Sequence, residues 1–339
     1  MGYKRFCGRT MLALLPIFLL AALYLVCDPF RVLRDYDSFY DPADSVWVNL
    51  NADYVATCTY DRQYDSLRYD AIIFGNSRSR YYQTEDWLRH LPKGSCPFHY
   101  DAHNESLYAL LRKVEYIERK GRPLRHALVV LDKALLEQDK AATPHLNYIS
   151  PQLEGNTLRA RMGFQAAFFK AWFSPKFIYT YLDARLSGKM RPYMAQSLYV
   201  MRPYAYNPLT NEEYMENEEA RIAAGTYYEE ADIIRCFKGK QHPGETSPTA
   251  LSEKGREELQ KLAEAFHRMG TDVRVVVSPL YDQIRLNPED VAALQKAFGA
   301  DRVHDFSGTN AFTSDKHNFY EPFHYRPVCA RQIMDCIYQ

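Results

Sequence analysis

The sequence carries no excess charge of either sign, since 42 Lys and Arg residues balance 42 Asp and Glu residues. Nucleic-acid-binding proteins usually show a basic excess, so no nucleic-acid partner is expected. Internal repeats and low-complexity tracts are lacking as well. None of the seven cysteines has a Cys/His spacing typical of a structural zinc site. We therefore expect a globular chain that holds neither a metal nor a cofactor.

A long apolar segment near the N-terminus, Thr10 to Cys27, contains no charged residue across 18 positions. This is the short end of a spanning helix and exceeds the usual apolar core of a signal peptide. No A-x-A cleavage pattern follows it, and Leu-Val before Cys27 makes a poor lipobox. We expect a cytoplasmic tail at 1–9 and an uncleaved single-pass anchor at 10–27. The basic tail predicts that the N-terminus lies inside and that residues 28–339 are extracytoplasmic.

The cysteines beyond the apolar segment would then meet an oxidising compartment. They number five, so at least one is unpaired or pairs between chains. Cys58 and Cys96 each precede an expected strand, and we expect a disulfide between them. Cys329 and Cys336 lie two turns apart on an expected helix, about 10 Å between Cα atoms, which is too far for a bridge.

Short, continuous apolar runs recur along the chain and are typical of strands buried on both faces of a sheet. Helical patterns separate these runs, and the strand–helix–strand order predicts a parallel, doubly wound α/β sheet of flavodoxin-like type. The expected strands are Asp70–Phe74, Phe98–Ala102, Ala127–Leu131, Val273–Ser278 and Val303–Phe306.

Several residues indicate where the helices of this α/β domain begin and end. Gly270 is expected as a helix C-cap, and Asn287 as an N-cap with Pro288 at the first helical position. Pro327 opens the last helix. The α/β domain is expected to span residues 70–339.

Two regions interrupt or precede the regular pattern. Residues 28–69 lack a clear period and are expected to form a tether and strap, with a short strand at Ser45–Val48. Residues of about 138–235 are expected to form a helical, aromatic-rich insertion. Its aromatic segment either packs a small core of its own or forms a lid or a face that meets a membrane or a membrane partner.

The stretch 71–80, Ala-Ile-Ile-Phe-Gly-Asn-Ser-Arg-Ser-Arg, holds the first candidate site residue. Gly75 permits a sharp turn after the first strand, and Ser77 follows at the strand's C-terminal mouth. Ligands of open α/β sheets bind in the crevice beyond these strand ends. Ser77 is therefore a candidate nucleophile, although Asn76 and Ser77 are also common turn and capping residues.

A second block, Asn-Phe-Tyr-Glu-Pro-Phe-His-Tyr-Arg-Pro at 318–327, stands just before the terminal helix. With the Gly75-Asn76-Ser77 block, it resembles the SGNH (GDSL-like) hydrolase superfamily. The nearest likeness is to membrane-anchored members that act in alginate O-acetylation and teichoic acid D-alanylation. The resemblance implies a nucleophile at Ser77, a base at His324 and an orienting carboxylate at Glu321.

The resemblance also implies oxyanion and substrate contacts. The Ser77 backbone N–H and Asn104 would stabilise the oxyanion, with Gly75 and Asn76 shaping the turn. Asp132 stands where the family has Asn, and an ionised carboxylate would repel an oxyanion. Arg78 and Arg80 are candidates for binding an anionic sugar, and Tyr281 for stacking on one.

Two functions are consistent with these residues. The first is a membrane-anchored serine O-acyltransferase or carboxyl esterase that adds or removes acyl groups on a cell-surface glycan. Resemblance implies a multi-spanning membrane acyltransferase partner that delivers the acyl donor. The second is a catalytically inactive glycan-binding or assembly protein that keeps the fold. The Ser77 and His324 blocks favour the first, and Asp132 favours the second.

Overall fold

The computed structural model describes residues 2–40, 46–196, 199–201 and 205–339. The chain divides into two compact units. One unit comprises Met1–Asn51, Pro144–Leu146 and Leu158–Arg202; the other comprises Ala52–Thr143, Asn147–Thr157 and Pro203–Gln339.

The second unit is built on a five-stranded parallel sheet with the order β3-β2-β4-β8-β9. Because their central positions carry apolar side chains buried on both faces, these strands are the continuous apolar runs that the sequence analysis predicted. Their bounds are β2 Ala71–Gly75, β3 Pro97–Asp101, β4 His126–Leu131, β8 Asp272–Val277 and β9 Val303–Asp305. All five predicted strands are confirmed.

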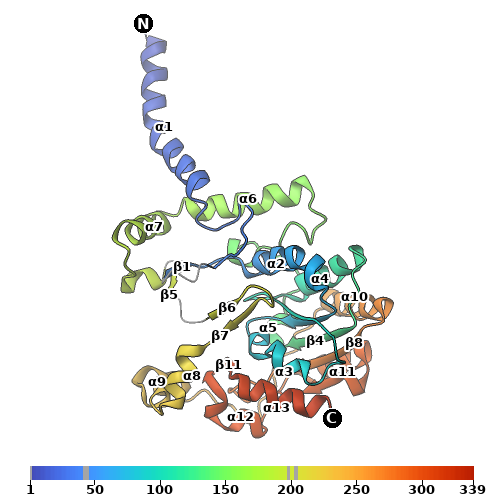
Figure 1. The fold of residues 1–339 in the computed structure, drawn as a ribbon. Helices are drawn as coiled ribbons and strands as arrows, with labels where there is room; N and C mark the ends of the chain where they lie inside the picture. The colour runs from blue at the N-terminus through green and yellow to red at the C-terminus, as the bar shows by residue number, and fades with distance from the viewer. Residues whose placement is uncertain (1, 41–45, 197–198, 202–204) are drawn as a thin grey trace. The chain divides into compact units, whose positions relative to one another are not determined.

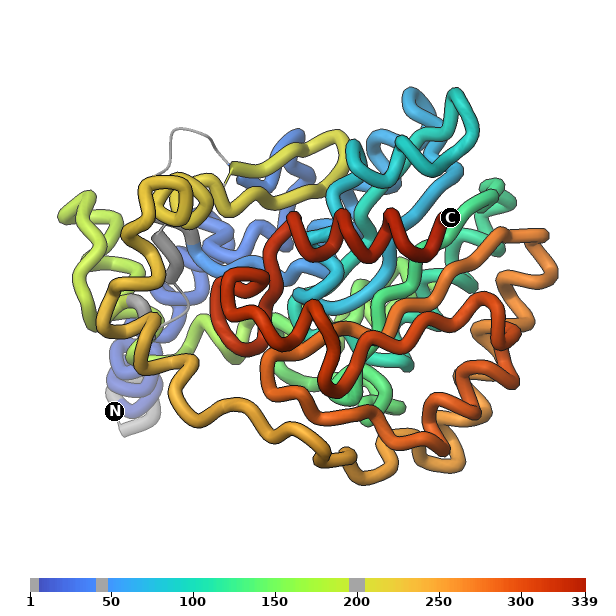
Figure 2. The backbone as a smooth tube through the Cα atoms, turned by 90° about the horizontal axis from the view of Figure 1, so that it is seen from below, coloured from blue at the N-terminus to red at the C-terminus, as the bar shows by residue number. Residues whose placement is uncertain are grey.

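Helices cover both faces of this sheet. Alternate residues of the strands belong to two separate apolar cores, because side chains of a strand alternate between faces. One core holds residues of α2 (Ala52–Leu67), α4 (Leu107–Arg119), α10 (Glu253–Met269) and α11 (Pro288–Phe298). The other holds residues of α3 (Thr84–Leu88) and α13 (Pro327–Ile337). Figure 2 shows α13, at the red end of the chain, beside the cyan segment that contains α3.

The structure has the three predicted helix ends, at Gly270, Asn287 and Pro327. Gly270 adopts a left-handed conformation (φ 66°) after α10, as a C-cap requires. The Asn287 side chain accepts a hydrogen bond from the Glu289 N–H at the start of α11. α13 begins at Pro327.

The expected strap at 28–69 is wrong over its second half, because Ala52–Leu67 forms the helix α2. Most of the buried residues of α2 are tyrosines and threonines, with Val55, Ala56 and Asp53, so the sequence shows no aliphatic stripe there. Tyr60 is fully buried and packs against Tyr100 with ring centroids 5.3 Å apart. The expected strand at 45–48 is present as β1 Val46–Val48; Ser45 lies outside the described residues.

Shorter elements surround the C-terminal mouth of the sheet. They include two antiparallel hairpins, β6–β7 and β10–β11. The bounds are α5 Lys133–Leu136, β6 Ala205–Asn207, β7 Glu212–Tyr214, α8 Glu216–Ala223, α9 Ala231–Phe237, α12 Ala311–Ser314, β10 Phe319–Glu321 and β11 His324–Tyr325. Short 3-10 turns lie at 79–81, 145–147, 192–196, 227–229, 300–302 and 316–318.

The first unit consists of an apolar N-terminal helix and an aromatic pair of helices (Figure 1). Its elements are α1 Gly2–Cys27, β1, α6 Leu158–Trp172, α7 Pro175–Ser187 and β5 Tyr199–Met201, which pairs with β1. Within α1, Phe6–Cys27 is long and apolar enough to cross a membrane, with a mean hydropathy of 2.5. A signal sequence near the N-terminus can also meet this criterion of length and composition.

The expected insertion at about 138–235 is divided between the two units, since 158–202 belongs to the first and 203–235 to the second. The expected Cys58–Cys96 disulfide is wrong: all seven cysteines are free. Cys58 lies inside α2 rather than before a strand, so the two cysteines do not both lie at the starts of neighbouring strands. Cys329 and Cys336 both lie on α13 and are unbridged, as expected.

A fully enclosed charge cluster joins α2 to α4. Lys113 on α4 is 0% exposed, and its Nζ lies 2.9 Å from Asp53 Oδ1 and in contact with Glu105 Oε2. The outer oxygens accept backbone N–H groups, Asp53 from Ser150 and Glu105 from Ser106. One cation thus faces two buried carboxylates. Burial, opposed by Lys113 and reinforced by Asp53, raises the pKa of Glu105 to about 7.

Candidate active site

The turn after β2 requires glycine at its first position. Gly75 has φ 154°, and a Cβ there would lie 2.6 Å from the Val130 carbonyl oxygen and 2.8 Å from Ser79 Cβ. The turn closes when the Asn76 carbonyl accepts both the Ser79 N–H (2.9 Å) and the Ser79 hydroxyl (2.8 Å). Ser77 therefore projects from a tight, buried turn at the C-terminal edge of the sheet.

The neighbours of Ser77 are fixed by the carboxylate of Asp132. Asp132 Oδ2 accepts hydrogen bonds from Asn76 Nδ2 and Arg78 Nη1, both at 2.6 Å, and Oδ1 caps α5 at the Leu135 N–H. Asp132 is 2% exposed. Asp132 is therefore expected to repel an oxyanion less than an unpaired carboxylate would. The Arg78 guanidinium and two N–H donors, from Asn76 and Leu135, already offset its negative charge.

A tight hairpin brings Glu321 and His324 together. β10 and β11 pair antiparallel with Glu321 opposite His324, and only Pro322 and Phe323 lie between them. His324 Nδ1 is hydrogen-bonded to Glu321 Oε1, while the Phe323 N–H donates to Glu321 Oε2 at 2.9 Å. The spacing of three residues thus makes the two side chains cross-strand neighbours.

Ser77 and His324 meet from positions 247 residues apart. The Ser77 Oγ lies 2.8 Å from His324 Nε2. Tyr81, from the 3-10 turn after β2, packs its ring edge-on to the His324 ring at 5.8 Å. His324 keeps 31% of its side chain exposed and Glu321 33%, so solvent-borne molecules reach the pair. The chain Ser77–His324–Glu321 has the connectivity of a serine nucleophile, a base and an orienting acid.

Of the two expected oxyanion donors, the Ser77 N–H is already hydrogen-bonded and the Asn104 side chain is exposed. The Ser77 N–H donates to the His103 carbonyl at 3.3 Å, so it already has an acceptor. Asn104, the next residue, is exposed in the same turn after β3. Its side-chain amide makes no hydrogen bond within the described part of the chain, and it adjoins the backbone that contacts Ser77.

The two arginines expected to bind sugar are engaged in ion pairs. Arg78 pairs with Asp132, and Arg80 Nη1 lies 2.9 Å from Glu213 Oε2 on β7. His103 Nε2 lies 3.8 Å from the other Glu213 oxygen. Burial raises the pKa of Glu213, but Arg80 and His103 outweigh it and bring the pKa to about 2. Both arginines therefore order the rim of the site.

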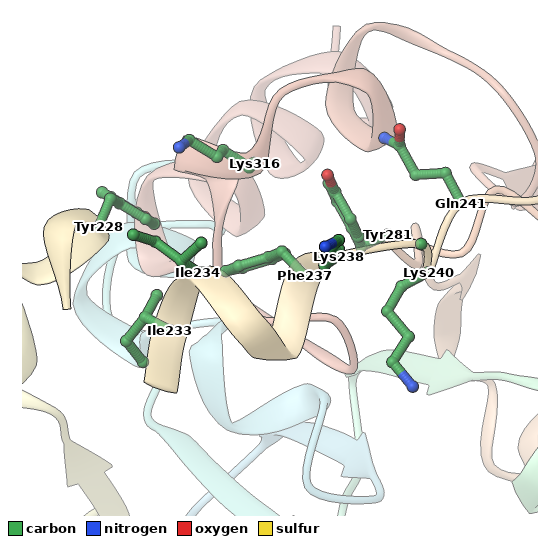
Figure 3. A pocket seen from close by; sticks show the side chains of 10 residues that line it. Tyr228, Ile233, Ile234, Phe237, Lys238, Lys240, Gln241, Tyr281 and Lys316 are labelled. Atoms are coloured by element: carbon green, nitrogen blue, oxygen red, sulfur yellow. The ribbon is translucent and has the colours of Figure 1, made fainter. Parts of the chain in front are cut away.

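Tyr281 lines a pocket beside the hairpin. Its N–H donates to the Pro322 carbonyl at 3.3 Å, and its ring packs on Phe237 at 4.8 Å. The pocket has a volume of about 510 Å³. Figure 3 shows Phe237 and Tyr281 between Lys316 on one side and Lys240 on the other. The lining residues are Tyr228, Ile233, Ile234, Phe237, Lys238, Gly239, Lys240, Gln241, Tyr281 and Lys316.

Cys236, the neighbour in sequence of the pocket residue Phe237, lies within electrostatic reach of the candidate acid. Burial raises the pKa of the Cys236 thiol on α9, and the negative charge of Glu321 adds to the rise. The lining contains three lysines and no acidic residue. An aromatic floor with a basic rim suits a sugar that carries negative charge.

Sequence reasoning missed Glu213, His103 and the role of Asp132 as a hydrogen-bond hub. The sequence shows Asp132 only as a departure from the family's Asn, because its partners Asn76 and Arg78 lie 56 and 54 residues away along the chain. The N-cap position of Asp132 before α5 was the available signal. No protein-family model matches the chain, and no curated protein matches it either.

Proposed function

We propose that this protein is a membrane-anchored serine acyltransferase or esterase that acts on acyl groups of a cell-surface glycan. The observation that carries the proposal is the hydrogen-bonded chain Ser77 Oγ–His324 Nε2 (2.8 Å) and His324 Nδ1–Glu321. Ser77 is the nucleophile, His324 the general base and Glu321 the group that holds the imidazole tautomer.

The contacts support a two-step transfer. The Ser77 oxygen attacks the acyl carbonyl carbon while its proton passes to His324 Nε2, and Glu321 stabilises the imidazolium. His324 then returns the proton to the leaving alcohol oxygen as the acyl–oxygen bond breaks. In the second step a glycan hydroxyl, or water in an esterase, gives its proton to His324 as its oxygen attacks the acyl carbon. His324 then passes that proton to the Ser77 oxygen as the Ser77–acyl bond breaks.

The fold supports the same assignment. The sheet order β3-β2-β4-β8-β9, with helices on both faces, is compatible with a doubly wound, flavodoxin-like arrangement of the SGNH kind. Ser77 follows β2, the first strand of this sheet along the chain, and the β10–β11 hairpin precedes the last helix, as the resemblance implies. We assign the lysine-rimmed Tyr281 pocket to the glycan.

The location that we propose is the outer side of a membrane, with α1 as a single-pass anchor and the N-terminus inside. An acyl donor delivered by a multi-spanning membrane partner would then reach Ser77 on that side. A reporter fused after Gln339 should be active only outside the cytoplasm. Activity of a cytoplasm-restricted reporter at that position would contradict this location.

A fluorophosphonate probe tests the catalytic assignment on the full chain in detergent. We expect labelling of the unaltered protein and none of Ser77→Ala, while Ser314→Ala, which removes an exposed serine of the same unit, keeps its label. His324→Ala should abolish labelling. His317→Ala should not, although His317 also pairs with a carboxylate, that of Asp315, at 2.8 Å. Equal labelling of all four variants would overturn the proposal.

A glycan-binding protein without catalysis is the second candidate. The observation in its favour is that the Ser77 N–H is bonded to the His103 carbonyl, which leaves the oxyanion with one fewer ready donor. A folded Ser77→Ala variant that restores glycan acylation in cells as well as the unaltered protein would select this candidate.

A further inference from the structure

The helix α6 carries apolar side chains on two separate faces. Its inward face places Ala160, Phe164, Phe168 and Trp172 at intervals of four residues, and all four are buried. Leu158, Met162 and Phe169 form a second, outward stripe. On a helix with 3.6 residues per turn, these three residues share a face that differs from the inward one. These three side chains are 67%, 63% and 41% exposed. A soluble helix needs only one apolar face, and Leu158 and Met162 of the second stripe lie exposed outside that face.

The exposed large apolar side chains outside α1 are concentrated on α6 and α7. Outside α1, nine large apolar or aromatic side chains are exposed in the part of the chain whose burial is described, and five of them lie on α6 and α7. Scattered exposed residues need no explanation, whereas a gathering of this kind marks an interaction surface. The five are Leu158, Met162, Phe169, Tyr179 and Leu186.

The same segment is strongly basic. Residues 158–191 contain seven Lys or Arg residues and one acidic residue, although the whole chain is neutral. Arg159, Arg161 and Lys170 are exposed on α6, next to the apolar stripe. Apolar side chains flanked by exposed cations are the composition of a helix that lies in the surface of an anionic membrane.

Contacts within the first unit tie this surface to α1. Trp172 Nε1 donates to the Leu20 carbonyl at 2.9 Å. Tyr24 packs edge-on against Phe169, a member of the outward stripe, at 5.5 Å, and against Trp172 at 5.9 Å. Figure 1 shows α6 running crosswise to α1 at its C-terminal end.

The length of α1 then fixes the depth of α6. The apolar part of α1 has 22 residues, or about 33 Å at a rise of 1.5 Å per residue. A bilayer's hydrocarbon core is about 30 Å thick, so a spanning α1 uses its whole length up to Cys27. Leu20 precedes Cys27 by about 10 Å along the helix, so Trp172, which is bonded to it, lies within about 10 Å of the outer headgroup boundary, the depth at which interfacial helices bury their apolar face.

We propose that α6 and α7 form a second membrane contact, in which the stripe Leu158–Met162–Phe169 enters the headgroup boundary and the flanking cations bind anionic lipid headgroups. This inference rests on α1 spanning the membrane and is independent of any catalysis at Ser77. The occupant of the surface is the bilayer that holds α1, because the stripe is continuous with that helix.

Tryptophan quenching by brominated lipids tests the contact on the full chain in phosphatidylglycerol-containing nanodiscs. Three variants are compared with the parent protein: Met162→Trp in the stripe, Leu14→Trp in α1, and Leu209→Trp, which is 48% exposed in the other unit. We expect the fluorescence added by Met162→Trp to be quenched by lipids brominated near the headgroup. The fluorescence added by Leu14→Trp should be quenched by lipids brominated deep in the acyl chain. Leu209→Trp should gain fluorescence that neither quenches.

The controls separate the contact from the anchor. If Leu14→Trp is quenched and Met162→Trp behaves like Leu209→Trp, α1 spans the bilayer and the second contact is refuted. That result would also follow if a protein partner covers the stripe. If Leu14→Trp is not quenched, α1 does not span and the proposal is refuted together with the anchor.

Charge reversal tests the lipid class. Arg159→Glu, Arg161→Glu and Lys170→Glu together should lower the ratio of docked to undocked α6 about 100-fold or more, because each cation lost at an anionic surface lowers that ratio about fivefold. The matched control reverses three exposed lysines of the other unit, Lys93, Lys261 and Lys296. Quenching of Met162→Trp that survives the α6 reversal, or that is equal in phosphatidylcholine nanodiscs, would overturn the anionic-lipid assignment.

Discussion

Two polar clusters of the sheet unit differ in how they use their charges. The Lys113 cluster is fully enclosed, and its lysine touches both carboxylates. The Ser77–His324–Glu321 chain lies at the sheet's edge with about a third of His324 and Glu321 exposed. A charge sealed inside can only hold elements together, whereas a half-exposed histidine beside a serine can exchange protons with a bound molecule. Exposure thus separates the structural cluster from the candidate catalytic one.

The sharpest test of this contrast is the loss of Ser77 or His324. Ser77→Ala and His324→Ala should each reduce hydrolysis of a small acetyl ester on the order of 10³- to 10⁶-fold, and the double variant should be scarcely worse. Their free energies of unfolding should change by about 0.5 kcal/mol or less, because neither side chain fills the core. Full activity in folded Ser77→Ala would remove the distinction between the clusters.

Lys113→Met should have the opposite profile. It leaves two carboxylates buried without a cation, which costs about 3–5 kcal/mol of stability. Thermal unfolding in detergent measures the loss. Adding Asp53→Asn and Glu105→Gln removes the buried negative charge and should restore part of the melting temperature. A single Lys113→Met variant as stable as the parent would show that the cluster is not structural.

Glu321→Ala should affect activity less than Ser77→Ala, by on the order of 10²-fold, because orientation of the histidine is only one part of the transfer. Ester hydrolysis measures the loss. Asp315→Ala is the matched control, since it breaks the exposed His317–Asp315 pair and leaves the candidate site intact. If both variants lose activity equally, Glu321 has no special role at His324.

The smallest expected effect is a pH dependence of stability from Glu105. Its pKa is raised in the folded chain to about 7 from a usual 4.5, so the folded state holds the proton more tightly. The stabilisation is fully present below pH 4.5 and is lost as the pH rises through 7. The slope is at most about 1.4 kcal/mol per pH unit. Glu105→Gln should remove this slope, and a slope unchanged by that substitution would contradict its origin in Glu105.

The sheet could be predicted from the sequence because short, continuous apolar runs such as Ile72–Phe74 are typical of strands buried on both faces. The candidate nucleophile and base could be found because Gly75 and the Glu321–His324 spacing are local features. The helix α2 could not be predicted, because its buried face is mainly tyrosine and threonine and shows no aliphatic period. The Asn76–Asp132–Arg78 contacts and the Arg80–Glu213 pair depend on strand neighbours far apart in the chain, which no local pattern records.

The hairpin that presents Glu321 and His324 has a consequence for recognising relatives of this chain. Because the two residues face one another across a two-residue turn, one inserted residue would send one of the side chains to the opposite side of its strand. The distance from Ser77 to this hairpin can change freely in the long loops between them. An alignment of distant relatives should therefore permit gaps anywhere between the two blocks but none inside Glu-Pro-Phe-His.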